Sequence, residues 1–133
     1  MLEPPPLPPG ITLQAWADGR LVFESRGKWL HPLFALGEHL EAHPQDGLLL
    51  RDTIVGRAAA FLIARLSVRK VWTTLASRRA VSVFEESRME LFAEKWTDRI
   101  DCLTEDALSE IRDPEQAWNL LAERRRAAQA FGR

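Results

Sequence analysis

The side chains best suited to chemistry gather in one short stretch of the sequence, from Asp52 to Arg57. Asp52 offers a carboxylate, Gly56 would let a ligand approach the backbone closely, and the Arg57 guanidinium suits a carboxylate or a phosphate. Arg57 also falls in the first turn of an expected helix, where the helix dipole disfavours a cation. Two interpretations stay open. Asp52 and Arg57 form a structural ion pair, or Arg57 and the amides near Gly56 bind a phosphate or carboxylate while Asp52 contacts a base or sugar of the same ligand.

The other reactive side chains give weaker patterns. His39 and His43 lie four residues apart on an expected helix, but no third ligand accompanies them, so we predict no metal site. Cys102 is the only thiol, and the carboxylates of Asp101 and Glu105 beside it disfavour the reactive thiolate. If the protein is an enzyme, Cys102 and Asp52 are the candidate catalytic residues.

The hydrophobic pattern predicts the elements that must position these residues. Two apolar runs flank Asp18-Gly19, which is a strong signal for a β-hairpin. Downstream, helices and strands alternate, which favours a sheet that is covered by helices and partly parallel after the hairpin. The pattern predicts helices over 32–43, 55–66, 77–86, 104–111 and 114–131, and strands over 11–16, 21–23, 47–50, 71–75 and 91–96.

Composition limits the class of protein. A chain of 133 residues with 46% apolar residues fits one globular domain. Residues 1–10 hold five of the eight prolines and are expected to form a flexible tail, which leaves 11–133 as the domain. The net charge of −1 argues against nucleic-acid binding. The absence of a signal peptide or a long apolar run predicts a cytoplasmic protein that does not bind membranes.

Several stretches together resemble a bacterial family known as domain of unknown function 1893. They are 21–27, 32–33, 52–60, 101–105 and 113–115, and the likeness extends over roughly residues 12–123. The family more often has lysine where Arg57 stands, and proline where Leu103 stands. The resemblance implies a cytidine-deaminase-like fold, with a three-layer α/β/α arrangement and a mixed sheet of about five strands. It implies no reaction. Ser25 lies in the first stretch and joins Asp52, Gly56 and Arg57 as a candidate ligand-binding residue.

Zinc-dependent deamination is not expected. A zinc deaminase needs three protein ligands and a glutamate that moves protons. At the first helix start His31 is followed two places later by Leu33, where the glutamate would stand. The second helix start, 55–59, holds no cysteine. We therefore predict no metal and no cofactor.

The resemblance does suggest a binding site. In a deaminase-like arrangement two helix N-termini point towards one cleft, and their free amides suit an anion. We therefore expect a domain that binds a nucleotide-like or other anionic small molecule. Two alternatives stay open: a non-catalytic interaction or structural protein, such as a homodimer, and an enzyme that uses Cys102 or Asp52.

Overall fold

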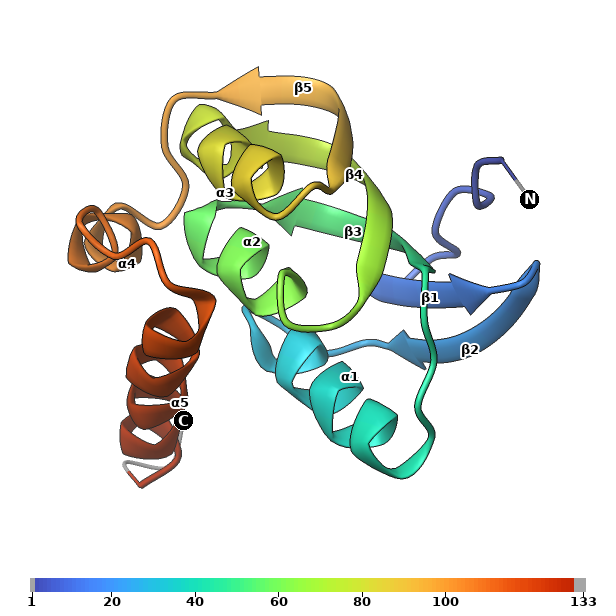
Figure 1. Cartoon of the computed structure of the whole chain (residues 1–133), viewed down its shortest axis with the longest axis horizontal. Helices are drawn as coiled ribbons and strands as arrows, with labels where there is room; N and C mark the ends of the chain where they lie inside the picture. Colours follow the sequence, from blue (N-terminus) through green and yellow to red (C-terminus); the bar gives the residue numbers. More distant parts are fainter. Residues whose placement is uncertain (1, 131–133) are drawn as a thin grey trace.

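The computed structural model describes residues 2–130, apart from the side chains of residues 102–103 and 128–130. Strands and helices alternate along the chain, as Figure 1 shows. In order they are β1 (Leu13–Ala17), β2 (Arg20–Ser25), α1 (His31–Ala42), β3 (Leu48–Val55), α2 (Arg57–Ile63), β4 (Val68–Ser77), the 3-10 turn η1 (Arg78–Ala80), α3 (Val81–Glu86), β5 (Glu90–Thr97), α4 (Cys102–Ala107) and α5 (Pro114–Ala130).

The predicted hairpin is present. Asp18 and Gly19 form the turn between β1 and β2, with φ angles of 50° and 77°. Two consecutive residues in the left-handed region give a turn whose twist matches that of paired strands. The hairpin pairs Leu13 with Ser25 at its open end. The Asp-Gly pair is therefore sufficient to place the first two strands.

The five strands form one mixed sheet in the order β2-β1-β3-β4-β5. β1 runs antiparallel to both of its neighbours, whereas β3, β4 and β5 are parallel. The predicted α/β class, the mixed five-stranded sheet and the N-terminal hairpin are thus confirmed. β5 lies at the edge, as its weak apolar pattern indicated.

The boundary between β3 and α2 differs from the prediction. The apolar pattern suggested a helix from residue 55, but β3 continues to Val55, which pairs with Ala76 of β4. Periodicity alone cannot separate a buried strand from the start of a buried helix. Because β3 is longer than predicted, Asp52 and Ile54 are strand residues close to the start of α2.

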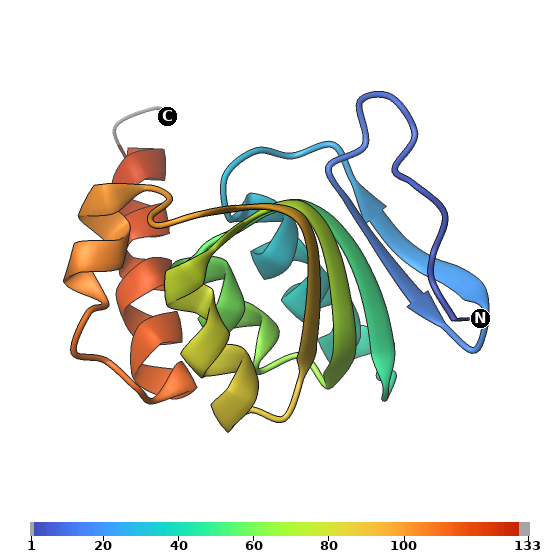
Figure 2. The same cartoon turned by 90° about the horizontal axis from the view of Figure 1, so that it is seen from above.

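The helices lie on one face of the sheet, which differs from the expected sandwich with helices on both faces (Figure 2). The connections through α1, α2 and α3 each cross the sheet in the same direction, and right-handed crossovers then place all three helices on the same side. α5 packs outside them. Its Trp118 ring lies 4.9 Å from the Phe34 ring and 4.1 Å from the Arg65 guanidinium.

α2 is the central helix of the core. Every residue from Ala58 to Ile63 is buried, as its nearly continuous apolar sequence predicted. It is surrounded by buried side chains from the sheet and the neighbouring helices, including Leu13, Leu36, Leu50, Val71, Phe84, Leu108 and Leu121. A helix held on all sides gives a rigid support for residues at its N-terminus.

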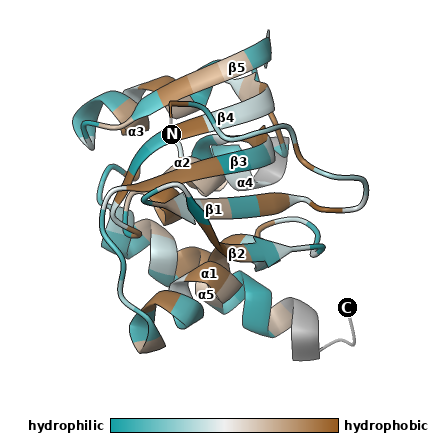
Figure 3. Cartoon of the chain, turned by 90° about the vertical axis from the view of Figure 1, so that its right-hand side faces the viewer, coloured by the Kyte–Doolittle hydropathy of each residue, from teal (hydrophilic) through white to brown (hydrophobic). Residues whose placement is uncertain are grey.

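The proline-rich segment lies against the opposite face of the sheet (Figure 3). Arg51 donates to the carbonyl oxygen of Pro4 at 2.7 Å and to that of Pro5 at 3.3 Å, and it pairs with Glu3 at 2.9 Å. Pro4 is buried. The expected flexible tail is therefore held in place, because Arg51 supplies donors that an extended proline-rich backbone cannot supply for itself. Within residues 2–130 there is no helix with the length and apolar composition to cross a membrane.

Candidate functional site

A pocket of about 320 Å³ opens beside the carboxyl end of β3. Three segments that are far apart in the sequence form most of its lining: residues 27–33, which lead from β2 into the first turn of α1, residues 52–59 where β3 passes into α2, and residues 100–105 around the start of α4. Its walls are largely apolar and include Leu33, Ala58, Ala59 and Ile100. Ligands of open α/β sheets bind at the carboxyl ends of strands, and this pocket occupies such a position.

The side-chain carboxylate of Glu105, a residue of α4, lies against the N-terminus of α2. Its Oε1 atom accepts a hydrogen bond from the backbone N–H of Arg57 at 3.2 Å, and the residue is only 1% exposed. The Oε2 atom has no hydrogen-bond partner among the described residues, and Arg79 Nε lies 4.0 Å from it. A carboxylate at this end of a helix is stabilised by the helix dipole. The protein therefore places its own anion where the sequence suggested a bound one.

Gly56 makes room for this carboxylate. A Cβ atom at position 56 would lie 3.0 Å from Glu105 Oε1 and 3.4 Å from the Cβ atom of Ile100. The Gly56 φ angle of −99° is open to any residue, so the need for glycine is purely steric. The sequence predicted a close approach of a ligand at Gly56, whereas in this structure the group that approaches Gly56 is the Glu105 carboxylate.

Gly56→Ala is therefore expected to lower the free energy of unfolding by about 1–2 kcal/mol, because the new methyl group displaces Glu105 or Ile100. Urea denaturation measures this loss. The double variant Gly56→Ala/Glu105→Ala should lose less than the sum of the two single variants, since the facing carboxylate is gone. A neutral effect of Gly56→Ala would mean that Glu105 is not seated against residue 56.

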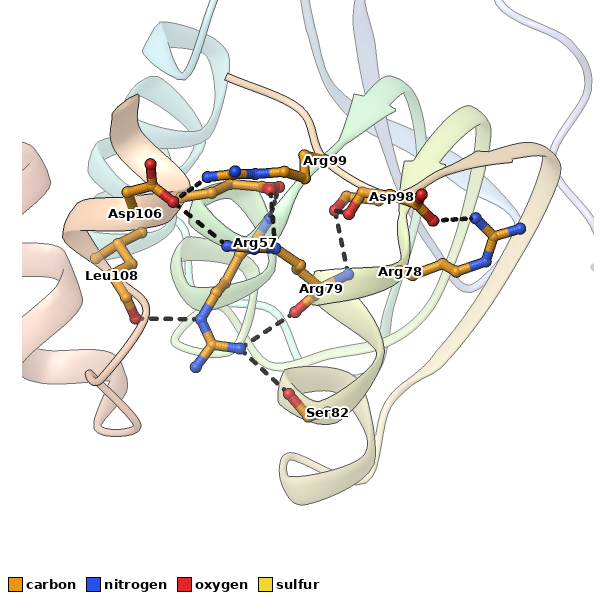
Figure 4. Close-up of polar contacts among 10 residues, drawn as sticks. Arg57, Arg78, Arg79, Ser82, Asp98, Arg99, Asp106 and Leu108 are labelled. Atoms are coloured by element: carbon orange, nitrogen blue, oxygen red, sulfur yellow. Dashed lines mark hydrogen bonds and ion pairs between the residues drawn. The ribbon is translucent and has the colours of Figure 1, made fainter. Parts of the chain in front are cut away.

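Arg57 does not line the pocket. Figure 4 shows its guanidinium directed towards Leu108, Arg79 and Ser82. It donates to the carbonyl oxygens of Leu108, Arg79 and Ile111 at 3.2, 3.2 and 2.8 Å, and to Ser82 Oγ at 3.2 Å. Burial lowers the pKa of Arg57. Within residues 2–130 the predicted Asp52–Arg57 ion pair is not formed, because these four acceptors already hold the guanidinium. Arg57 instead joins α2 to η1, α3 and the segment between α4 and α5.

Asp52 does face the pocket. Its Oδ1 atom accepts the N–H of Thr53 at 2.7 Å. Burial raises the pKa of Asp52 to about 7, although hydrogen bonds from the N–H groups of Thr53 and Ile54 partly oppose the rise. Near neutral pH the carboxyl group therefore exists in both protonation states. Carboxyl groups of this kind in a cleft are candidates for proton transfer or for ligand recognition.

Two residues in the left-handed region meet at the pocket. Trp29 has a φ angle of 56°, Asp101 has one of 49°, and Trp29 Nε1 donates to Asp101 Oδ2 at 3.2 Å. The Trp29 side chain is large, and the residue is 44% exposed. Such backbone geometry is uncommon outside glycine and concentrates at functional sites. The hydrogen bond joins two lining segments that are 72 residues apart.

The remaining candidates from the sequence lie around the pocket or outside it. Ser25 Oγ accepts the N–H of Gly27 at 3.0 Å, so Ser25 shapes the turn into the pocket without lining it. Cys102 begins α4, but its side chain lies outside the described part of the structure. The rings of His39 and His43 lie 4.8 Å apart, and among the described residues no three metal-ligating side chains come together.

Comparison with known proteins identifies the fold. The sequence matches the family model described as "TM1506: Domain of unknown function (DUF1893)" over residues 12–124. A crystal structure of a DUF1893 family protein from Thermotoga maritima is similar with a TM-score of 0.74 and 22% identity, covering 86% of this chain and 80% of that one. The apo dCMP deaminase from the cyanophage S-TIM5 has a TM-score of 0.49 and 14% identity, covering 65% of this chain and 79% of that one. No curated protein matches the sequence.

Proposed function

The chain belongs to the DUF1893 family, and we propose that it is a small-molecule-binding domain whose site is the pocket beside the carboxyl end of β3. One observation carries this proposal: the pocket encloses the carboxyl groups of Asp52 and Glu105 within a largely apolar wall. Binding sites for small molecules commonly combine apolar walls with a few polar groups that fix the ligand's orientation. A cytoplasmic location, suggested by the composition, fits this proposal.

A second function is favoured by Asp52. Because its pKa lies at about 7, this carboxyl group can donate or accept a proton near neutral pH. An enzyme that uses Asp52 as a general acid or base would need the same pocket. Binding is the primary proposal because it requires only the cavity and its polar groups, whereas catalysis also requires a reacting group of the ligand to be placed beside Asp52.

A thermal-shift screen of the full chain tests the primary proposal. The screen covers nucleosides, nucleotides, sugar phosphates, carboxylates and amines. A ligand at one hundred times its dissociation constant should stabilise the fold by about 2.7 kcal/mol, which raises the melting temperature by several degrees. Turnover of any compound that binds would then be sought at several pH values, which tests the role of Asp52 as an acid or base.

Substitutions of Ile54 show whether a compound binds in this pocket. Ile54 lines the pocket and is 47% exposed, so a larger side chain there narrows the pocket at little cost to the core. Ile54→Trp should abolish the thermal shift, whereas the control Ile54→Val should keep it. A shift that survives in Ile54→Trp, or a screen in which no compound stabilises the protein, contradicts the proposed function.

A further inference from the structure

The charges that line the pocket are mostly negative. Its ionisable side chains are the carboxyl groups of Asp52, Asp101 and Glu105 and the ammonium group of Lys28. Glu105 is buried and Asp52 is partly buried, whereas Lys28 is exposed. Asp101 is exposed as well, so two of the three carboxyl groups lie deeper than the ammonium group. The charge of a ligand in the pocket interacts most strongly with the least solvated groups. The depth of these carboxyl groups therefore favours a positive ligand.

Glu105 provides an open acceptor. Its Oε1 atom is bonded to the Arg57 N–H, but its buried Oε2 atom lacks a hydrogen-bond donor among the described residues. Arg79 forms a long ion pair with Oε2, 4.0 Å from its Nε atom and beyond hydrogen-bond distance, and it shares its charge with Asp106 at 3.6 Å. A buried acceptor without a donor is costly, and native structures usually satisfy it. Glu105 therefore keeps hydrogen-bonding capacity and negative charge that the described residues do not fully satisfy.

The groups that would hold an anion are already engaged. The Arg57 N–H at the start of α2 is bonded to Glu105, and the Arg57 guanidinium is bonded to carbonyl oxygens and a hydroxyl outside the pocket. A phosphate or carboxylate would also face the carboxyl groups of Asp52 and Glu105. The anionic ligand expected from the sequence is therefore poorly matched to this lining.

We infer that the pocket takes an organic cation, a primary amine, amidine or guanidine on an apolar body, whose N–H groups are donated to Glu105 and Asp52. This inference rests on the proposed function and names its ligand class. The apolar body would contact Leu33, Ala58 and Ala59, which line the same cavity. The Trp29 ring also lines it, and an aromatic face attracts a cation.

The proton equilibrium of Asp52 is consistent with this ligand class. Burial holds its pKa at about 7, so part of the population is neutral at physiological pH. A bound cation would favour the ionised carboxylate and lower that pKa. Binding should therefore release protons near neutral pH, and it should be tightest where Asp52 is already ionised.

Three probes of similar shape but different charge test the inference: benzylamine as a cation, benzyl alcohol as a neutral molecule and benzoate as an anion. Each is titrated calorimetrically into the full chain at about pH 8, where Asp52 is ionised. We expect benzylamine to bind at least about tenfold more tightly than benzyl alcohol, because its hydrogen bonds to carboxylates are charge-assisted. Benzoate should show the weakest binding.

Glu105→Gln removes the buried charge and keeps an oxygen that can accept the Arg57 N–H. It should reduce the preference for benzylamine over benzyl alcohol by about tenfold. Glu110→Gln is the matched control, because Glu110 is exposed and does not line the pocket, and this variant should keep the preference. If circular dichroism shows that Glu105→Gln is unfolded, Asp52→Asn is tested in its place. It should likewise reduce the preference for benzylamine over benzyl alcohol.

The outcomes separate the ligand class from the binding function. Equal binding of the three probes, tighter binding of benzoate, or no binding of benzylamine overturns the cation inference, whereas the compound screen with the Ile54 variants tests the proposed function independently. An unchanged preference in both Glu105→Gln and Asp52→Asn also overturns it. If benzylamine binds equally well to Ile54→Trp, the cation site lies elsewhere and both proposals fail.

Discussion

Arg57→Ala is expected to lower the free energy of unfolding by about 2–4 kcal/mol. The guanidinium donates four hydrogen bonds, three of them to backbone carbonyl oxygens that join α2 to separate parts of the chain. Its removal leaves these acceptors without a donor and also removes the contact with the Phe61 ring, which lies 5.0 Å away. Urea denaturation followed by circular dichroism measures the loss.

Two further variants distinguish this structural role from a general effect of charge. Arg57→Lys keeps the charge but loses the planar fork of donors, so we expect an intermediate loss of stability. Arg78→Ala removes a neighbouring arginine whose side chain is 62% exposed and pairs with Asp98, and it should change stability by less than about 0.5 kcal/mol. If Arg57→Ala were fully stable but no longer bound a ligand, Arg57 would be a ligand-binding residue after all.

Asp52→Asn should change how the stability of the protein depends on pH. The pKa of Asp52 is about 7 in the folded chain, against 3.8 for an ordinary aspartate. Between these values the folded state binds a proton that the unfolded state has released, so this group's contribution to stability falls as pH rises and is lowest above pH 7. Asparagine stays neutral throughout. The variant should equal the wild type near pH 4 and be about 1–3 kcal/mol more stable near pH 8.

Asparagine is a suitable probe because its side-chain oxygen can still accept the Thr53 N–H. Asp46→Asn serves as the control, since Asp46 is exposed and lies outside this pocket. Melting temperatures measured from pH 4 to pH 8 for the three proteins provide the comparison. Parallel profiles for the wild type and Asp52→Asn would show that the environment of Asp52 does not raise its pKa.

Local sequence patterns predicted most of the fold. Asp18-Gly19 located the hairpin because few residue pairs accept two left-handed conformations in succession. Asp113 before Pro114 located the start of α5, and its Oδ1 atom accepts the Glu115 N–H at 3.2 Å. Ser77 likewise accepts the N–H of Arg79 at the start of η1. These features depend on neighbouring residues, which a sequence displays directly.

The site was less predictable because its contacts are distant in sequence. Gly56 and Asp52 line the pocket, and their role as ligand-binding residues stays a prediction. Glu105, 48 residues beyond Arg57, was noticed only as a neighbour of Cys102. No local pattern shows which helix N-terminus a buried carboxylate will occupy. Arg57 was misjudged for the same reason, since its partners reach as far as Ile111. The Arg51 contacts that hold the proline-rich segment also span more than 40 residues.

The most direct test of the account is a crystal structure of the protein grown with benzylamine. We expect the ammonium nitrogen to lie within hydrogen-bond distance of a carboxylate oxygen of Glu105 or Asp52, with the phenyl ring against Leu33 and Ala59. A probe bound with its ring towards Glu105, or bound only outside the pocket, would contradict the claim that this pocket recognises an organic cation.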